Sequence, residues 1–135
     1  MHRLSIGILA YGLLVACAPT DSPADAKLKQ AIAGTWRLEY TTSSEQLLQS
    51  TVTLGADGHY SEIENIGGKQ TRYEGPWYVT EGLLKMNGKK INGQGVSVGA
   101  MTFATCRIGA VNSAGFSCRN DVANKTYHYV RANAS

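Results

Sequence analysis

The sequence predicts an all-β protein: a small antiparallel barrel of about eight strands, preceded by a short helical turn. Three observations lead to this fold class. Apolar and polar residues alternate in several runs along the chain. Turn signals rich in Gly, Asp and Asn separate these runs at spacings of roughly 8–12 residues. No long stretch carries the apolar repeat of a helix.

The first residues have the features of an export signal. Met1-His2-Arg3 is short and basic, and residues 4–16 follow as 13 uncharged residues. A membrane-spanning helix needs about 20 apolar residues, so this run is too short to span a bilayer. A basic start, an apolar stretch and a small-residue exit are typical of a secretory signal peptide. We therefore expect residues 1–16 to be removed.

Leu14-Val15-Ala16-Cys17, at the end of that run, resembles the lipobox of bacterial lipoproteins. The resemblance implies that Cys17 becomes the mature N-terminus and carries lipid, palmitate included. Ala18 after it implies sorting to the outer membrane, with the protein facing the periplasm. One acyl chain binds a membrane marginally, whereas two or three together hold it almost permanently. The alternative is an ordinary signal peptide followed by an incidental cysteine.

The mature chain of 119 residues has the size of one domain. Its 12 basic and 10 acidic residues are interspersed, which argues against a nucleic acid partner. Residues 17–26 combine the lipidated terminus with a segment of linker composition, and residues 27–135 are predicted to form the barrel domain.

Two cysteines remain once Cys17 is assigned to lipid. An oxidising compartment favours a disulfide between Cys106 and Cys118. A metal site or a redox couple are the alternatives. A metal site calls for further Cys or His at short spacing, and a redox couple usually has two residues between its thiols.

The elements follow in chain order. Residues 27–33 place Leu28, Ala31 and Ile32 on one helical face, and Gly34 ends the turn. Strands are expected at residues 35–40, 48–54, 59–66, 70–79, 83–86, 96–108, 115–119 and 126–131. Turns are expected at residues 56–58, 67–68, 81–82 and 87–88, and residues 87–99 read as a loop or weak strand. Pro76 predicts an edge or a bulge in the fourth strand.

Antiparallel strands in this number avoid open edges by closing into a barrel or a sandwich. Gly34-Thr35-Trp36, entered from a helical turn, is similar to the lipocalin signature, and residues 28–86 resemble the lipocalin-like domains of bacterial lipoproteins. The resemblance implies a barrel whose floor is closed by a basic residue of the last strand lying across the signature tryptophan. Arg131 over Trp36 is the expected contact, a cation–π interaction of about 0.5–2 kcal/mol.

The sequence does not predict an enzyme. His59 and His128 lie far apart within strand patterns. Glu62 and Glu64 share one strand face, and although such a pair could do acid–base work, we interpret it as a solvated face. Motifs of serine hydrolases, zinc proteases and P-loops are missing from the chain. No catalytic residue, metal or cofactor is therefore expected.

Aromatic residues in the strands suggest either a packed core or the walls of a cavity. The candidates to line the interior are Tyr40, Tyr60, Tyr73, Trp77, Phe103 and Phe116. Small residues among the later strands leave room and favour a cavity. The predicted function is a lipid-anchored envelope protein that binds a small hydrophobic or amphipathic ligand. The alternative is a module that binds an envelope protein, such as a periplasmic enzyme inhibitor or an immunity protein, with Tyr127 and Tyr129 on an exposed patch.

Overall fold

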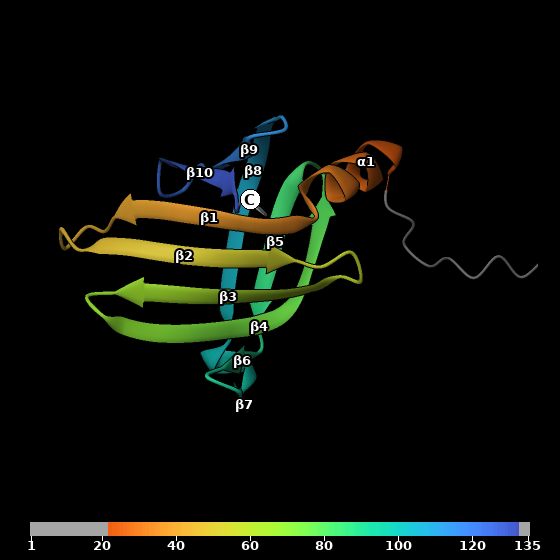
Figure 1. Cartoon of the computed structure of the whole chain (residues 1–135). Helices are drawn as coiled ribbons and strands as arrows, with labels where there is room; N and C mark the ends of the chain where they lie inside the picture. The colour runs from red at the N-terminus through yellow and green to blue at the C-terminus, as the bar shows by residue number, and fades with distance from the viewer. Residues whose placement is uncertain (1–21, 133–135) are drawn as a thin grey trace, which may run out of the picture.

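The alternating runs of the sequence become the strands of a closed barrel in the computed structural model, which describes residues 22–132. The eight barrel strands are β1 (Gly34–Thr41), β2 (Leu47–Leu54), β3 (His59–Ile66), β4 (Lys69–Thr80), β5 (Leu83–Gly88), β8 (Thr102–Val111), β9 (Gly115–Asn120) and β10 (Lys125–Arg131). All pairings are antiparallel, and β10 pairs with β1 to close the ring (Figure 1). The predicted eight-stranded antiparallel barrel is confirmed.

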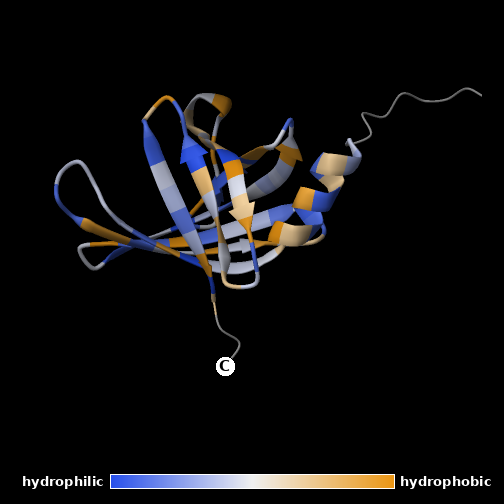
Figure 2. Ribbon diagram, turned by 90° about the horizontal axis from the view of Figure 1, so that it is seen from above, coloured by the Kyte–Doolittle hydropathy of each residue, from blue (hydrophilic) through white to orange (hydrophobic). Residues whose placement is uncertain are grey.

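Strand alternation decides which side chains fill the barrel. In β1, Trp36 and Leu38 are buried, whereas Arg37 and Glu39 between them are exposed. Successive side chains of a strand point to opposite faces, so one face of each strand faces the interior and the other faces water. Apolar and polar residues accordingly alternate along the strands in Figure 2. The core is the inside of the barrel.

The α-helix α1 (Pro23–Ile32) covers one end of the barrel. Ser22 caps it by accepting a hydrogen bond from the Asp25 backbone N–H, and Pro23 occupies the first turn, where it needs no donor. The Asp25 carboxylate accepts hydrogen bonds from the backbone N–H groups of Glu81 and Gly82, both at 2.9 Å. The predicted linker, residues 17–26, is therefore wrong from Pro23 onward, because these caps extend the helix by one turn.

Two predicted boundaries in the second half of the chain are also wrong. Asn87 and Gly88 do not turn the chain but continue β5, where they pair with Phe103 and Thr102 of β8. A Cβ on Gly88 would meet the Thr102 hydroxyl, so glycine is required here for close strand approach and not for a turn. The predicted strand at 96–108 begins only at Thr102. Before it come the short strands β6 (Lys90–Ile91) and β7 (Gln94–Gly95) and a 3₁₀ turn, Val98–Ala100.

The expected edge or bulge at Pro76 corresponds to a local gap in pairing on one side of β4, a strand that is otherwise paired on both sides. On one side β4 pairs with β3 throughout. On the other side it pairs with β6 at Tyr73 and Glu74 and with β5 only from Trp77. The backbone N–H of Trp77 bonds toward β3, so the nitrogen of Pro76 faces this gap between partners. A missing donor is tolerated there.

The predicted disulfide is confirmed. Cys106 of β8 and Cys118 of β9 are bonded, with Cα atoms 5.3 Å apart, and both side chains are buried inside the barrel. The chain-entropy model gives a loop of this length about 3 kcal/mol of stability. Within residues 22–132, no helix is both long and apolar enough to cross a membrane.

Candidate functional site

A cavity of about 340 Å³ occupies the part of the barrel interior that lies away from α1. Its volume falls within the range of small-molecule pockets, roughly 300–1,000 Å³. The apolar part of the lining comes from Leu38, Met86, Phe103, Ala104 and Cys106. The polar part is dominated by five tyrosines and two carboxylates: Tyr40, Tyr60, Tyr73, Tyr127, Tyr129, Glu62 and Glu64. The lining is therefore amphipathic.

The cavity has an opening beside the first half of β8. This strand pairs with β5 from Thr102 to Arg107, but with β9 only from Arg107 onward. Residues 102–105 therefore have a free edge, and Phe103 on it is 65% exposed while still lining the cavity. Tyr127 lines the cavity from β10, in the same part of the barrel. The barrel wall is therefore not continuously paired beside the cavity.

The strand β3 directs two carboxylates into the cavity. Tyr60 is buried, and the alternation of the strand puts Glu62 and Glu64 on the same inward face. The interpretation of these two residues as a solvated face is therefore wrong. Ser50 of β2 donates a hydrogen bond to Oε1 of Glu62 at 2.5 Å. Neither carboxylate has an ion-pair partner within residues 22–132.

Burial changes the acid–base behaviour of both carboxylates. It raises the pKa of Glu62 and of Glu64 above the ordinary value, because a charged carboxylate loses hydration inside the barrel. The hydroxyl of Ser50 acts against this shift at Glu62, and the charge of Glu64 adds to it. The phenols of Tyr60, Tyr73 and Tyr129 share this interior.

The tyrosines surround the carboxylates. Burial raises the pKa of Tyr40 and of Tyr60 to about 12, so both phenols stay neutral and able to donate hydrogen bonds. Tyr129 is 5% exposed, and burial together with the nearby charge of Glu62 raises its pKa further. At the outer end of the cavity Tyr40 and Tyr127 meet edge to face, with ring centroids 5.1 Å apart.

A lysine lies on this outer aromatic pair. The Lys125 ammonium is 3.8 Å from the centroid of the Tyr40 ring and 5.5 Å from that of Tyr127, and it donates a hydrogen bond to the carbonyl of Thr41. Its contacts are with the rings and the backbone, and it does not line the cavity. The aromatic pair thus binds a cation in the structure.

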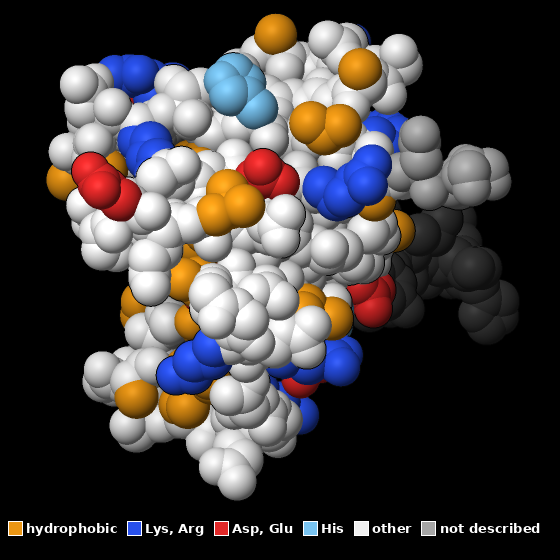
Figure 3. Space-filling model, turned by 60° about the vertical axis from the view of Figure 1, so that its left-hand side comes forward, with side chains coloured by type: hydrophobic (Ala, Val, Ile, Leu, Met, Phe, Trp, Pro, Cys, Tyr) orange, Lys and Arg blue, Asp and Glu red, His pale blue; other side chains and the backbone are white. Residues whose placement is uncertain are grey.

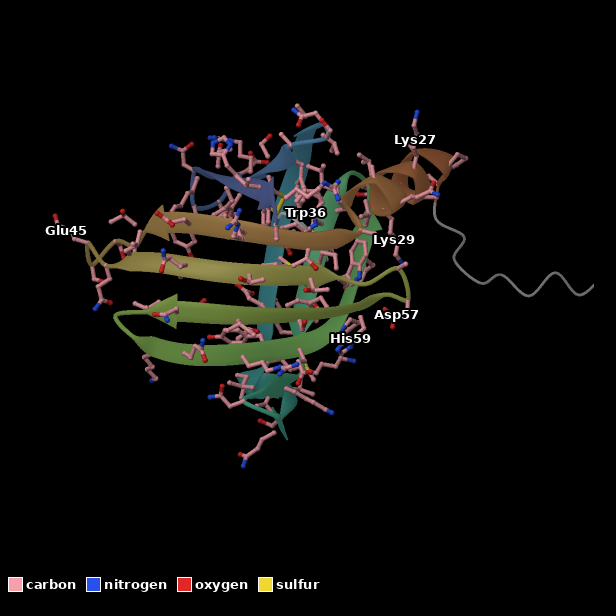
Figure 4. All side chains as sticks on the ribbon, viewed as in Figure 1. Lys27, Lys29, Trp36, Glu45, Asp57 and His59 are labelled. Carbon is pink, nitrogen blue, oxygen red and sulfur yellow. A yellow bond between two sulfur atoms is a disulfide. The ribbon has the colours of Figure 1, made fainter. Side chains whose placement is uncertain are left out.

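The other end of the barrel is filled. The guanidinium carbon of Arg131 lies 4.4 Å from the centroid of the Trp36 ring, so the contact implied by the lipocalin resemblance is present. The Trp36 indole donates a hydrogen bond to the carbonyl of Ile32 in α1, and Figure 4 shows Trp36 at the end of the barrel beside that helix. Phe116 packs edge to face on Trp36 and stacks on Tyr129.

The six aromatic residues predicted to line the interior divide into two groups. Tyr40, Tyr60, Tyr73 and Phe103 line the cavity. Trp77 and Phe116 are buried but lie outside its lining, because Trp77 packs under α1 with its indole bonded to the Gly55 carbonyl, and Phe116 fills the space above Trp36. The predicted lipid site Cys17 lies outside the described residues.

The lining residues that sequence reasoning missed include two carboxylates and two tyrosines. The prediction of a solvated face for Glu62 and Glu64 does not follow from their spacing. They lie two and four residues after the buried Tyr60, and strand alternation therefore puts them on the same inner face. For Tyr127 and Tyr129 the sequence does not decide between packing in the core and an exposed patch. In the structure both line the cavity. His59 and His128 are exposed, so neither histidine contributes to the cavity.

The face of the molecule shown in Figure 3 carries scattered basic, acidic and apolar side chains rather than one patch. In comparisons with known proteins, no family model and no curated protein matches this chain.

Proposed function

We propose that the barrel binds one small amphipathic molecule in its cavity, without chemistry of its own. The observation that carries the proposal is the cavity itself, whose lining is amphipathic and which opens beside β8. Small barrels of eight strands either fill with side chains or keep room for one ligand, and this one keeps room. The thiols that a reaction could use, Cys106 and Cys118, are joined in the disulfide.

We further propose that the protein is an outer membrane lipoprotein whose barrel faces the periplasm. The support is in the sequence: a basic start, an uncharged run and the lipobox resemblance ending at Cys17. The disulfide agrees with an oxidising compartment.

The position of the tyrosines favours a ligand over a protein partner. An interaction module would carry Tyr127 and Tyr129 on an exposed aromatic patch. Tyr129 is instead buried, and Tyr127 is half-buried beside Tyr40. The alternative of an inhibitor or immunity protein is therefore an outcome of the test and not a second proposal.

The test uses two forms of the chain made in a Gram-negative host. One is the full chain, and in the other residues 1–17 are exchanged for a cleavable secretory signal without a lipid-attachment cysteine. We expect the full chain in the membrane fraction and the exchanged form in the soluble periplasm. Native mass spectrometry of the soluble form should show a mass excess that denaturation releases.

Each outcome decides one part of the proposal. If both forms fractionate alike, the lipid attachment is wrong. If the soluble form has the bare mass of the chain and no amphiphile added to it is bound, the binding proposal is wrong. Capture of envelope proteins on the immobilised barrel would then support the interaction module.

A further inference from the structure

We propose that the cavity is selective for a protonated amine on an apolar body, and that the ammonium group binds between Glu62 and Tyr129. This inference rests on the proposed function and names the chemical class of the ligand. It follows from three features of the cavity: its charge balance, the hydroxyl of Tyr129 that faces it, and its aromatic walls.

The charge balance of the cavity is one-sided. Its lining includes two carboxylates and no lysine, arginine or histidine. Removing a carboxylate from water without a partner is costly, so such groups pair with a cation or take up a proton. Glu62 has only the Ser50 hydroxyl as a hydrogen-bond donor, and Glu64 has no ion-pair partner within residues 22–132. A cationic ligand supplies the missing charge, whereas a fatty acid would add a third anion.

The hydroxyl of Tyr129 is the second feature. This side chain is 5% exposed and lines the cavity. Within residues 22–132 no fully buried side-chain oxygen lacks a hydrogen-bond partner, so the Tyr129 hydroxyl, which forms no hydrogen bond there, faces the open space of the cavity. A hydroxyl that faces a cavity without a protein partner is available for a hydrogen bond to a ligand atom or to water. Glu62 of β3 and Tyr129 of β10 line the same cavity. An ammonium group donates up to three hydrogen bonds and can reach both.

The aromatic walls are the third feature. Tyr40, Tyr60, Tyr73 and Tyr127 present π-systems to the cavity, and cations bind favourably to aromatic faces. The structure already contains one such contact, because the Lys125 ammonium lies 3.8 Å from the centre of the Tyr40 ring. That contact lies outside the cavity lining. Inside the cavity, the tyrosine rings can accept the ammonium of a ligand, while Leu38 and Met86 accept its apolar part.

The experiment compares three probes that share one eight-carbon tail: octylamine, octanoate and octyl glucoside. Isothermal titration calorimetry at mildly alkaline pH measures their binding to the soluble exchanged form. We expect octylamine to bind about tenfold or more tightly than octyl glucoside, since a charge-assisted hydrogen bond contributes that much, and octanoate to bind most weakly.

The variant Glu62→Gln keeps the shape and the acceptor for Ser50 but removes the charge. It should lower the affinity for octylamine about tenfold while leaving that for octyl glucoside unchanged. The matched control is Glu39→Gln, which removes the same charge from an exposed residue on the outer face of β1. If E62Q fails to fold by circular dichroism, Tyr129→Phe replaces it and should weaken octylamine selectively.

The outcomes separate the two proposals. If none of the three probes binds, the proposed function fails with this inference. If all three bind with equal affinity, the barrel binds amphiphiles but the selectivity for amines is overturned. If E62Q and E39Q reduce octylamine binding equally, the effect is one of net charge and the site at Glu62 is wrong.

Discussion

The two halves of the barrel interior are built from the same strands but filled differently. Next to α1 the side chains are packed until hardly any surface remains, and those that are 1% exposed or less include Trp36, Val52, Leu54, Trp77 and Val79. Farther from α1, tyrosines and carboxylates of β1, β3, β4 and β10 surround a cavity of about 340 Å³. The filled half therefore stabilises the fold, whereas the open half leaves room for a ligand.

The largest expected effect is in the filled half. Trp36→Ala removes a side chain with no exposed surface, together with its contacts to Phe116 and Arg131. We expect a loss of about 3–5 kcal/mol in the free energy of unfolding, measured by urea denaturation. Tyr73→Ala in the open half should cost much less, because its ring borders an existing cavity. Equal losses would contradict the division into two halves.

A smaller effect is expected at the floor of the filled half. Arg131→Ala removes the cation–π contact with Trp36, which is worth about 0.5–2 kcal/mol. The urea midpoint should fall and the tryptophan emission should shift, because the guanidinium shields that ring. Arg37→Ala is the control, since Arg37 is an exposed neighbour on the outer face of β1. If both variants behave alike, the floor contact does not stabilise the barrel.

The free energy of unfolding should depend on pH through the carboxylate of Glu62 in the open half. The sign of this dependence is opposite to that of a carboxylate whose charged form is stabilised by folding. Burial raises the pKa of Glu62 in the folded state above its ordinary value of 4.5. The folded state then holds the proton of Glu62 more tightly than the unfolded state. The contribution of Glu62 to stability is therefore highest below pH 4.5 and falls as the pH rises through the folded pKa. Glu62→Gln should remove the contribution of Glu62 to this slope, leaving that of Glu64, and be the more stable protein at neutral pH. Urea midpoints measured across the acidic-to-neutral range test this, and an unchanged slope would contradict it.

The barrel could be predicted from the sequence because its first four strands obey simple alternation. The predicted ranges of β1 to β4 agree with the structure to within two residues, since Trp36, Tyr60 and Trp77 mark their inner faces. Boundaries that depend on distant partners could not be predicted. Asn87-Gly88 has the composition of a turn, but pairing with β8 keeps both residues in the strand.

The site was harder to predict than the fold. Charged residues usually face water, so composition alone assigned Glu62 and Glu64 to the surface. The spacing from Tyr60 carried the correct answer, and it outweighs composition because the alternation of a strand is fixed by its backbone. Likewise, Ser22 before Pro23 is a helix-start signal that the proline-rich composition of residues 18–26 concealed.

The chain enters the barrel at its filled end, through α1. Cys17 precedes Ser22 by five residues, a reach of about 18 Å at full extension. If Cys17 holds the proposed lipid, the filled end of the barrel stands closest to the bilayer. The opposite end, marked by the turn at Glu45 in Figure 4, points away from it. The barrel would then exchange its cargo with the aqueous compartment and not directly with the lipid layer beneath it.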